Sequence, residues 1–365
     1  MSNFSDKNEI RVGIVDDSPL VREIIESVVN SAPGMKVAGM AGDPYEAREM
    51  IKSCNPDVLT LDIEMPRMDG LEFLEKIMRL RPMPVIMVST LTTQGGEIAL
   101  RALELGAIDY IGKPVMNTQT SQSQDDFLKY FRSQLIPKLK AAHESDLGRR
   151  LALEAEVKNQ KPVKRAPACG FDIIGIASST GGIERLRYLF SNLRCSLPPV
   201  LIVQHIHKNF VQSMAQRMQT ILPEHLKIEV ARHRSTLQKN TIYLADNLKH
   251  LSVKDINHKL SINLIDKPAR NGFVASADYL FESMSLISSK NRCGIIISGM
   301  GNDGAKGLLE LKQSGALTLG ESEESCMVYG MPRAAEKLGA LKKSLSMKSM
   351  LHAFNSGEIN NYTKH

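Results

Sequence analysis

The sequence predicts two α/β domains, each built on a doubly wound parallel sheet, joined by a partly helical linker. The chain has 365 residues, which exceeds the roughly 100–200 residues of a typical single domain. Short β-rich apolar runs alternate with segments of helical period in both halves. Residues 1–116 hold 12 Lys and Arg against 18 Asp and Glu, whereas residues 117–365 hold 34 against 22. We therefore expect an acidic front domain and a basic back domain.

The front domain, placed at residues 10–142, is predicted from strands and helices in strict alternation. Strands are expected at 11–15, 36–40, 58–62, 85–89 and 107–112, and helices at 18–31, 44–53, 70–79, 95–105 and 127–142. A polar stretch at 117–126 precedes the last helix. Strands alternating with helices indicate a parallel sheet that is covered on both faces.

A linker is predicted at residues 143–170, where charged residues and then a segment rich in Lys and Pro replace the apolar pattern. The back domain is placed at residues 171–357. Its strands are expected near 172–177, 200–204, 241–244, 294–298 and 316–320, separated by polar or helical segments.

Composition excludes several classes of protein. The chain is 42% hydrophobic and 24% charged, which is typical of an ordinary soluble protein. Its five cysteines form no CxxC pair and no Cys/His set with zinc spacing, so neither a disulfide framework nor a structural metal is expected. No apolar run approaches the roughly 18 residues of a membrane span, and the first 11 residues are polar. These observations predict a cytoplasmic protein.

Acidic residues gather where the predicted front strands end. Asp16 and Asp17 follow the first strand, Asp62 ends the third, and Lys113 follows the fifth. Because the carboxyl ends of parallel strands meet at one edge of a sheet, these side chains are expected to converge. Such oxygens suit Mg²⁺, which binds through a few carboxylates and coordinates phosphate. Asp16 and Asp17 also suit a helix N-terminus, but a cap does not explain the other strand ends.

This set, with Ser89 after the fourth strand, resembles the response-regulator receiver domain over residues 10–115. The resemblance implies a flavodoxin-like fold, Mg²⁺ as cofactor and a histidine kinase as phosphodonor. It implies that Asp62 is the phosphoacceptor and that Mg²⁺ is held by Asp16, Asp17, Asp62 and the Glu64 carbonyl. It also implies that Lys113 pairs with the phosphate, that Ser89 hydrogen-bonds it, and that Tyr110 reorients when Ser89 moves. Ser89 is preferred to Thr90 because it directly follows the apolar run 85–88.

A serine, a histidine and an aspartate lie at three predicted strand ends of the back domain. Ser179 lies in Ser-Ser-Thr-Gly-Gly, His205 ends Val-Gln-His, and Asp303 lies in Gly-Met-Gly-Asn-Asp-Gly. Such a set supplies a nucleophile, a general base and a carboxylate that orients the base. Each residue alone has a plainer explanation, as a turn, a helix cap or a core histidine. The following histidines lack a strand-end position and are expected to face solvent: His207, His233 and His250.

These runs, with Ser-Cys and Gly-Met-Pro-Arg landmarks at 325–333, resemble the chemotaxis protein-glutamate methylesterases over residues 171–354. The resemblance implies a Rossmann-like hydrolase domain that needs no cofactor and acts on methyl-accepting chemoreceptors. It implies that Ser179 is the nucleophile, His205 the general base, Asp303 its orienting carboxylate, Thr180 a supporting residue, and the Met300 and Gly301 amides the oxyanion hole.

The sequence departs from the family pattern at two places. Ala177 and Ser178 stand where the family usually has Gly-Ala before its nucleophile. The run Phe273-Val274-Ala275-Ser276 stands where the family typically has His-Arg-Pro-Ser. We expect the first change to bear on the nucleophile turn and the second on substrate binding.

We therefore expect phosphorylation-controlled hydrolysis of glutamate methyl esters, and deamidation of glutamines, on cytoplasmic helices of chemoreceptors, with no nucleic acid bound and no membrane insertion. In the family the unphosphorylated receiver covers the effector site, so phosphorylation of Asp62 is expected to loosen that cover. A non-catalytic, phosphorylation-dependent binding module is the alternative, favoured by Ala177, Ser178, Phe273 and Ala275. A DNA-binding regulator would suit the basic back half, but the sequence shows no helix-turn-helix with clustered basic residues.

Overall fold

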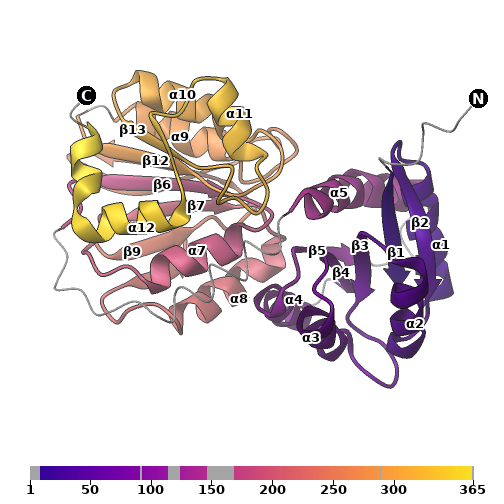
Figure 1. Cartoon of the computed structure of the whole chain (residues 1–365). Coiled ribbons are helices and arrows are strands. Elements are labelled where there is room, and N and C mark those ends of the chain that lie inside the picture. The colour runs from indigo at the N-terminus through magenta and orange to yellow at the C-terminus, as the bar shows by residue number, and fades with distance from the viewer. Residues whose placement is uncertain (1–8, 91–92, 114–123, 146–167, 288, 364–365) are drawn as a thin grey trace, which may run out of the picture. The chain divides into compact units, whose positions relative to one another are not determined.

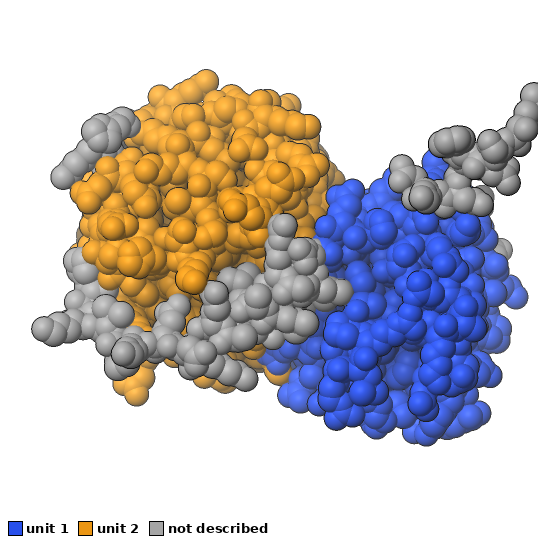
Figure 2. Space-filling model, viewed as in Figure 1, with its two compact units in different colours: residues 1–148 blue, residues 149–365 orange. Residues whose placement is uncertain are grey.

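The chain forms two compact units, residues 1–148 and 149–365 (Figure 2). A computed structural model describes residues 9–90, 93–113, 124–145, 168–287 and 289–363. Most of the predicted linker, residues 146–167, lies outside these described residues, so the limits 10–142, 143–170 and 171–357 stay a prediction. Each unit has its own parallel sheet, which confirms the predicted class of two α/β domains.

Unit 1 is a five-stranded parallel sheet with the strand order β2-β1-β3-β4-β5 and helices between the strands (Figure 1). This order is the flavodoxin-like one, and its switch point lies between β1 and β3. The elements are β1 (Ile10–Val15), α1 (Pro19–Asn30), β2 (Met35–Ala41), α2 (Pro44–Cys54), β3 (Val58–Asp62), α3 (Gly70–Leu80), β4 (Val85–Thr90), α4 (Thr93–Leu105), β5 (Asp109–Lys113) and α5 (Gln124–Glu144).

Local sequence explains why the helices of unit 1 begin where they do. The side chains of Ser18, Asp43 and Asp69 lie at the N-caps of α1, α2 and α3 and accept hydrogen bonds from backbone amides of the first turn. Such caps satisfy amides that have no partner inside the helix. Every residue of β3 is buried, as expected for a strand with helices on both faces of its sheet. The carboxyl ends of β1 and β3 are thereby brought together.

Unit 2 is a seven-stranded parallel sheet with the order β14-β13-β12-β6-β7-β9-β8 (Figure 1). Its switch point lies beside β6, which has β7 on one side and β12 on the other. The elements are β6 (Ile173–Ser178), α7 (Gly182–Ser191), β7 (Val200–Gln204), α8 (Lys208–Gln219), β8 (Lys227–Val230), β9 (Thr241–Leu244), β10 (His250–Ile256), β11 (Lys259–Ile265), α9 (Ala277–Ser285), β12 (Arg292–Ile296), α10 (Ala305–Gln313), β13 (Leu317–Glu321), α11 (Met331–Lys337), β14 (Lys343–Leu345), α12 (Met347–Ser356) and a 3₁₀ helix (Glu358–Thr363).

Four strands of unit 2 were not among the predicted elements: β8, β10, β11 and β14. Strands β10 and β11 form an antiparallel hairpin outside the parallel sheet, paired from His250 with Ile265 to Ile256 with Lys259. Their two-residue loop, Asn257 and His258, has positive φ at both positions. This geometry is that of a type I′ turn, but the loop lacks the glycine that marks such turns in a sequence.

Helices cover the sheet of unit 2 and enclose its core. Helices α9 and α10 pack against each other, as do α7 and α12 (Figure 1). The five cysteines all lie among the described residues and are free thiols. Within the described residues, no helix has both the length and the apolar character needed to cross a membrane.

Candidate functional site

Two acidic side chains and one lysine meet at the carboxyl edge of the unit 1 sheet. Asp16 directly follows β1 and Asp62 ends β3, and their side chains are almost completely buried. Lys113, at the end of β5, lies between them, with Nζ 2.8 Å from Asp16 Oδ2 and 2.8 Å from Asp62 Oδ2. Asp17 is exposed at the same edge. The predicted convergence of these strand ends is therefore present in the structure.

The two buried carboxylates at this edge carry more negative charge than the single Lys113 ammonium neutralises. Burial and the nearby Asp16 carboxylate raise the pKa of Asp62 to about 6, although Lys113 opposes the rise. Burial likewise raises the pKa of Asp16 above its usual value. Burial would lower the pKa of Lys113, but its hydrogen bonds to the two carboxylates raise it overall. Two buried carboxylates share one ammonium, which favours binding of a further cation.

Other predicted residues of unit 1 lie near this edge or outside the described part. Tyr110, on β5, is buried, and the Lys138 ammonium lies 6.0 Å from the centre of its ring. Glu64 is exposed in the loop after β3. The backbone of Ser89 pairs with Gly112 in the sheet, but its side chain lies outside the described residues.

In unit 2, the Ser-Ser-Thr-Gly-Gly run forms a tight turn between β6 and α7. Gly181 has a φ of +75°, and a Cβ added to it would lie 2.8 Å from Ser298 Oγ. A Cβ added to Gly182 would lie 2.6 Å from Gln204 Oε1. Only glycine fits at these two positions, because the first needs a left-handed backbone and the second a close approach. The turn holds Ser179 at the strand end, where its amide donates to the Ser298 carbonyl at 3.0 Å.

The two adjacent serines of this turn have different surroundings. Ser178 is fully buried, and its Oγ donates to Gln204 Oε1 at 2.5 Å. Gln204 Nε2 in turn donates to the Ser179 carbonyl at 2.9 Å. Ser179 is the first residue after the strand and is 7% exposed. Ser178 therefore supports the turn, whereas Ser179 is the less buried of the two serines.

His205 and Asp303 form a buried pair beside this turn. The amide of His205 donates to the Ser178 carbonyl at 3.0 Å, and its Nε2 lies 2.9 Å from Asp303 Oδ2. Because a carboxylate only accepts hydrogen bonds, Nε2 carries the proton of the neutral ring. His205 Nδ1 is buried and has no hydrogen-bond partner among the described residues. The ring thus offers a lone pair on the side away from Asp303.

The Asp303 carboxylate is fully buried and surrounded by donors. It accepts hydrogen bonds from Ser276 Oγ at 2.5 Å, the Ala277 amide at 2.7 Å and Asn271 Nδ2 at 2.9 Å, in addition to His205. Burial alone would raise the pKa of Asp303, but the His205 contact and the Ser276 and Ala277 donors lower it overall. The carboxylate is therefore held in its ionised form.

The loop after β12 offers free backbone amides at the same end of the sheet. Gly301 has a φ of +87°, and no atom lies within 4 Å of the position that its Cβ would occupy. The amides of Met300 and Gly301 donate to no acceptor among the described residues. Uncommitted amides of this kind stabilise negative charge that develops on an acyl oxygen.

A buried ion pair holds this loop against the serine turn. Glu321, at the end of β13, is fully buried and accepts hydrogen bonds from the Ser298 amide at 2.9 Å and from Ser325 Oγ at 2.8 Å. Arg185 Nε lies 3.2 Å from the same carboxylate. Ser298 Oγ donates to the Thr180 carbonyl at 2.9 Å. Thr180 and the loop are thus fixed to each other through Ser298.

One sequence expectation about the histidines is wrong. His250 was expected to face solvent, but it is fully buried, with Nδ1 accepting from the Ser276 amide at 3.0 Å and Nε2 beside the Pro268 carbonyl at 3.1 Å. It begins β10, so its burial depends on the hairpin that the sequence did not reveal. His207 is half-buried and caps α8, and His233 is exposed as expected.

Two residues that contact Asp303 were not singled out from the sequence as site residues. Ser276 also caps α9, where its Oγ accepts from the Asp278 amide at 3.3 Å. Asn271 lies in an Asn-Gly pair, which is the strongest short-range signal of a hairpin turn. Both signals were available in the sequence, but neither indicates contact with a residue about 30 positions away.

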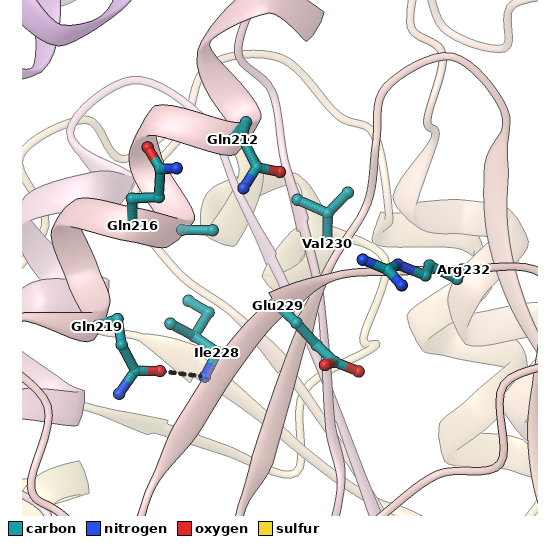
Figure 3. A pocket seen from close by; sticks show the side chains of 8 residues that line it. Gln212, Gln216, Gln219, Ile228, Glu229, Val230 and Arg232 are labelled. Atoms are coloured by element: carbon teal, nitrogen blue, oxygen red, sulfur yellow. Dashed lines mark hydrogen bonds between the residues drawn. The ribbon is translucent and has the colours of Figure 1, made fainter.

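A surface groove of about 530 Å³ lies between α8 and the edge strand β8 (Figure 3). Its lining consists of Gln212, Ala215, Gln216, Gln219, Ile228, Glu229, Val230 and Arg232. Gln219 Oε1 accepts from the Ile228 amide at 2.9 Å, which ties the helix to the strand. None of the predicted site residues lines this groove.

Two known protein families match this chain, one in each half of the sequence. The CheB methylesterase family matches residues 174–354, and the response regulator receiver domain family matches residues 12–123. Protein-glutamate methylesterase/protein-glutamine glutaminase 1 of Dechloromonas aromatica is 41% identical over 344 residues, which cover 93% of this chain and 96% of that protein. The chain belongs to the protein-glutamate methylesterase/protein-glutamine glutaminase family.

A second relative and one solved domain are also similar to this chain. Protein-glutamate methylesterase/protein-glutamine glutaminase 2 of Vibrio vulnificus is 42% identical over 333 residues, which cover 91% of this chain and 93% of that protein. The solved methylesterase catalytic domain of Thermotoga maritima CheB is 28% identical, with a TM-score of 0.48, and the match covers 50% of this chain and 97% of that one.

The two family matches contain the two strand-end sites. The acidic edge of unit 1 lies in the receiver match, and receiver domains generally bind Mg²⁺ through acidic residues. Asp16, Asp17 and Asp62 fit such an ion, because they offer carboxylate oxygens within 4.8 Å of one another. Ser179 and the His205–Asp303 pair lie in the methylesterase match.

Proposed function

We propose that this chain hydrolyses glutamate methyl esters and deamidates glutamines on methyl-accepting chemoreceptors in the cytoplasm, under the control of phosphorylation at Asp62. The observation that carries the proposal is the buried His205–Asp303 pair beside the turn that holds Ser179, in a chain of the methylesterase family. The named activity of the full-length relatives favours a catalytic role over a binding module without chemistry.

Ser179 is the proposed nucleophile of the first step. Its Oγ attacks the ester carbonyl carbon, and the hydroxyl proton passes to His205 Nδ1, which is the nitrogen that has no other partner among the described residues. Asp303 keeps the ring in this orientation and stabilises the imidazolium that forms. The amides of Met300 and Gly301 are the proposed donors to the tetrahedral oxyanion, and Thr180 supports the turn.

The second half of the reaction releases the leaving group and then the acid. Protonated His205 gives its proton to the departing methoxide, so methanol leaves and an acyl-Ser179 ester remains. Water then attacks this ester while His205 takes a proton from the water. His205 gives that proton to Ser179 Oγ as the acyl–oxygen bond breaks, which regenerates Ser179, and the new glutamic acid loses its proton to solvent as a carboxylate. With a glutamine side chain the same steps release ammonia in place of methanol. No group beyond this chain and water enters the proposed chemistry.

In unit 1, Asp62 is the proposed phosphoacceptor. Its carboxylate oxygen attacks the phosphorus of a phosphohistidine on a histidine kinase, or of a small phosphodonor, and forms an acyl phosphate while the histidine or the donor's leaving group departs. Asp16, Asp17, Asp62 and the Glu64 carbonyl are the proposed holders of Mg²⁺, which would neutralise charge on the transferred phosphoryl group when bound. Lys113 pairs with the phosphate, and Ser89 and Tyr110 are the proposed switch residues.

The adjacent serines provide the test of the proposed active site. We expect the full chain, with Mg²⁺ and a small phosphodonor, to release labelled methanol from chemoreceptors that carry methyl-labelled esters. Ser179→Ala should reduce this release by at least about a thousandfold, because the nucleophile is lost. Ser178→Ala is the matched control, because it removes the neighbouring hydroxyl from a supporting position, and we expect a loss of no more than about tenfold.

Two outcomes would contradict the proposal. Equal release by wild type and Ser179→Ala would reject Ser179 as nucleophile. If the wild-type chain binds receptors but releases no methanol with or without the phosphodonor, the chain is a binding module and the proposed activity is wrong.

A further inference from the structure

The segment between β11 and α9 contains a tight hairpin next to the His205–Asp303 pair. The amide of Arg270 donates to the Phe273 carbonyl at 3.0 Å, and the amide of Phe273 donates to the Arg270 carbonyl at 3.0 Å. The two residues between them, Asn271 and Gly272, have φ values of +53° and +85°. This pattern is a two-residue turn of the Asn-Gly type, which holds its flanking residues in one geometry. We call these four residues the 270–273 hairpin.

Phe273 of this hairpin lies flat against the His205 ring. The two ring centres are 3.7 Å apart and the planes differ by 3°. The His205 side chain is only 4% exposed, and the Phe273 ring covers one whole face of it. A stacked ring blocks rotation of the imidazole out of its plane and keeps water from that face. The plane in which Nδ1 and Nε2 lie is therefore set by Phe273.

Asn271 of the same hairpin contacts the other member of the pair. Its Nδ2 donates to Asp303 Oδ1 at 2.9 Å and to Asp278 Oδ2 at 2.9 Å. Asp278 is fully buried, with Oδ1 accepting from the Gly307 amide at 2.8 Å. Arg270 Nε lies 3.4 Å from Asp278 Oδ2. The hairpin is thus anchored to two buried carboxylates of unit 2, Asp303 and Asp278.

The positive charge that His205 acquires during the proposed reaction makes a phenyl ring suitable at position 273. During acyl transfer His205 becomes a cation, and the face of an aromatic ring attracts a cation that lies against it. A cationic side chain in the same place would repel the imidazolium. The ring also adds no hydrogen-bonding group that would compete with Ser179 for Nδ1.

We propose that Phe273 is a positioning residue for the acyl-transfer reaction: stacked on His205, it fixes the plane of the general base and stabilises the imidazolium that forms as Ser179 attacks. This role rests on the proposed function of His205 and Asp303. It predicts that loss of the ring slows the chemical steps and leaves substrate binding unchanged, because Phe273 acts through His205 and not on the substrate.

The test is the kinetics of two variants of the full chain, activated by a small phosphodonor and Mg²⁺ and assayed for methanol release from methyl-labelled chemoreceptors. Phe273→Leu removes the aromatic face and should lower kcat about tenfold or more with KM within about twofold of wild type. Phe273→Tyr keeps the ring and should retain kcat within about twofold. An unchanged kcat in Phe273→Leu, a loss confined to KM, or equal losses in both variants would overturn the proposal.

A matched control uses the same substitution beside another histidine. Phe210→Leu removes a buried ring that packs edge-on against His207, with ring centres 5.8 Å apart, and should leave kcat within about twofold of wild type. A loss as large as that of Phe273→Leu would mean that kcat responds to general loosening of unit 2, and the proposal would fail. The NMR signals of the His205 ring protons should move downfield in Phe273→Leu, because the ring current is lost, and stay in place in Phe273→Tyr.

A third variant separates failure of this inference from failure of the proposed function. His205→Gln should abolish methanol release. If His205→Gln is inactive but Phe273→Leu has full kcat, only the positioning role is wrong. If His205→Gln retains wild-type activity, the proposed active site itself is wrong, and the role of Phe273 fails with it.

Discussion

Each unit has a buried carboxylate at the carboxyl edge of its parallel sheet, and the pKa values of these two groups are shifted in opposite directions. Asp62 lies beside Asp16 with one lysine for both, and burial together with the Asp16 charge raises its pKa to about 6. Asp303 accepts four hydrogen bonds, and although burial opposes the change, His205 and the other donors lower its pKa. The difference comes from the neighbouring charges and the number of donors and not from the depth of burial, since both side chains are almost inaccessible.

This contrast teaches how one fold class serves two chemistries. The unit 1 edge carries more negative charge than its own residues neutralise, which suits a site that takes up a cation and a phosphoryl group. The unit 2 edge has a carboxylate whose hydrogen bonds are all made within the protein, which suits an orienting group that does not itself react. Excess negative charge therefore distinguishes the proposed phosphorylation site, and a complete set of hydrogen bonds distinguishes the proposed catalytic carboxylate.

The largest expected effect comes from breaking the saturated network. Asp303→Asn should lower kcat for methanol release by about 10³–10⁴-fold, because an amide would present a donor where Asp303 now only accepts and would no longer stabilise the imidazolium. Asp246→Asn is the control, since Asp246 also follows a strand of this sheet but accepts only from the amides of Leu248 and Lys249. A loss below about tenfold in Asp303→Asn would contradict the orienting role.

The next effect comes from removing the reactive carboxylate of unit 1. Asp62→Asn should abolish stimulation of methanol release by a small phosphodonor and leave the unstimulated rate within about twofold, because no acyl phosphate forms on an amide. Methanol release with and without the phosphodonor measures the effect. Undiminished stimulation of the Asn variant would show that the phosphoryl group acts elsewhere.

A smaller effect, on stability, tests the buried ion pair between Arg185 and Glu321, which supports the loop after β12. Arg185→Met leaves buried Glu321 without its cation and should destabilise unit 2 by about 3 kcal/mol. Arg187→Met on the same helix breaks a more exposed pair with Glu184 and should cost only about 0.5 kcal/mol. Hydrogen exchange of the β12 and β13 amides in the two variants measures both, and equal costs would reject the importance of burial.

The fold and much of the candidate site follow from the sequence for physical reasons. Parallel strands gather their carboxyl ends at one edge, so the strand positions of Asp16, Asp62 and Lys113 were enough to predict that they meet. The approach of His205 to Asp303 followed from the same rule. These predictions required only the positions at which the strands end, and the ends of short apolar runs in the sequence indicate those positions well.

The remaining features depend on irregular backbone that has no period in the sequence. The burial of His250 required the β10–β11 hairpin, whose Asn-His loop has no glycine to mark it. The stacking of Phe273 on His205 required the position of a turn relative to a distant strand. The family resemblance already indicated Ser179 and not Ser178 as the nucleophile, but the contact of Ser178 with Gln204 is visible only in the packed structure.

The opposite tuning of the two carboxylates also makes stability depend on pH in opposite ways. Because folding raises the pKa of Asp62, its contribution to stability is present below the ordinary value of 3.8 and is lost as pH rises through about 6. Because folding lowers the pKa of Asp303, its contribution is present above 3.8 and is lost as pH falls through the lowered value.

The measurement that tests this account most directly is a ¹³C NMR titration of the two carboxyl groups in the full chain in metal-free buffer, with Asp62→Asn and Asp303→Asn used to assign the signals. The account predicts that the Asp62 signal titrates with a midpoint near pH 6 and that the Asp303 signal titrates with a midpoint below the ordinary value of 3.8. Two signals that titrate together near pH 4 would contradict it.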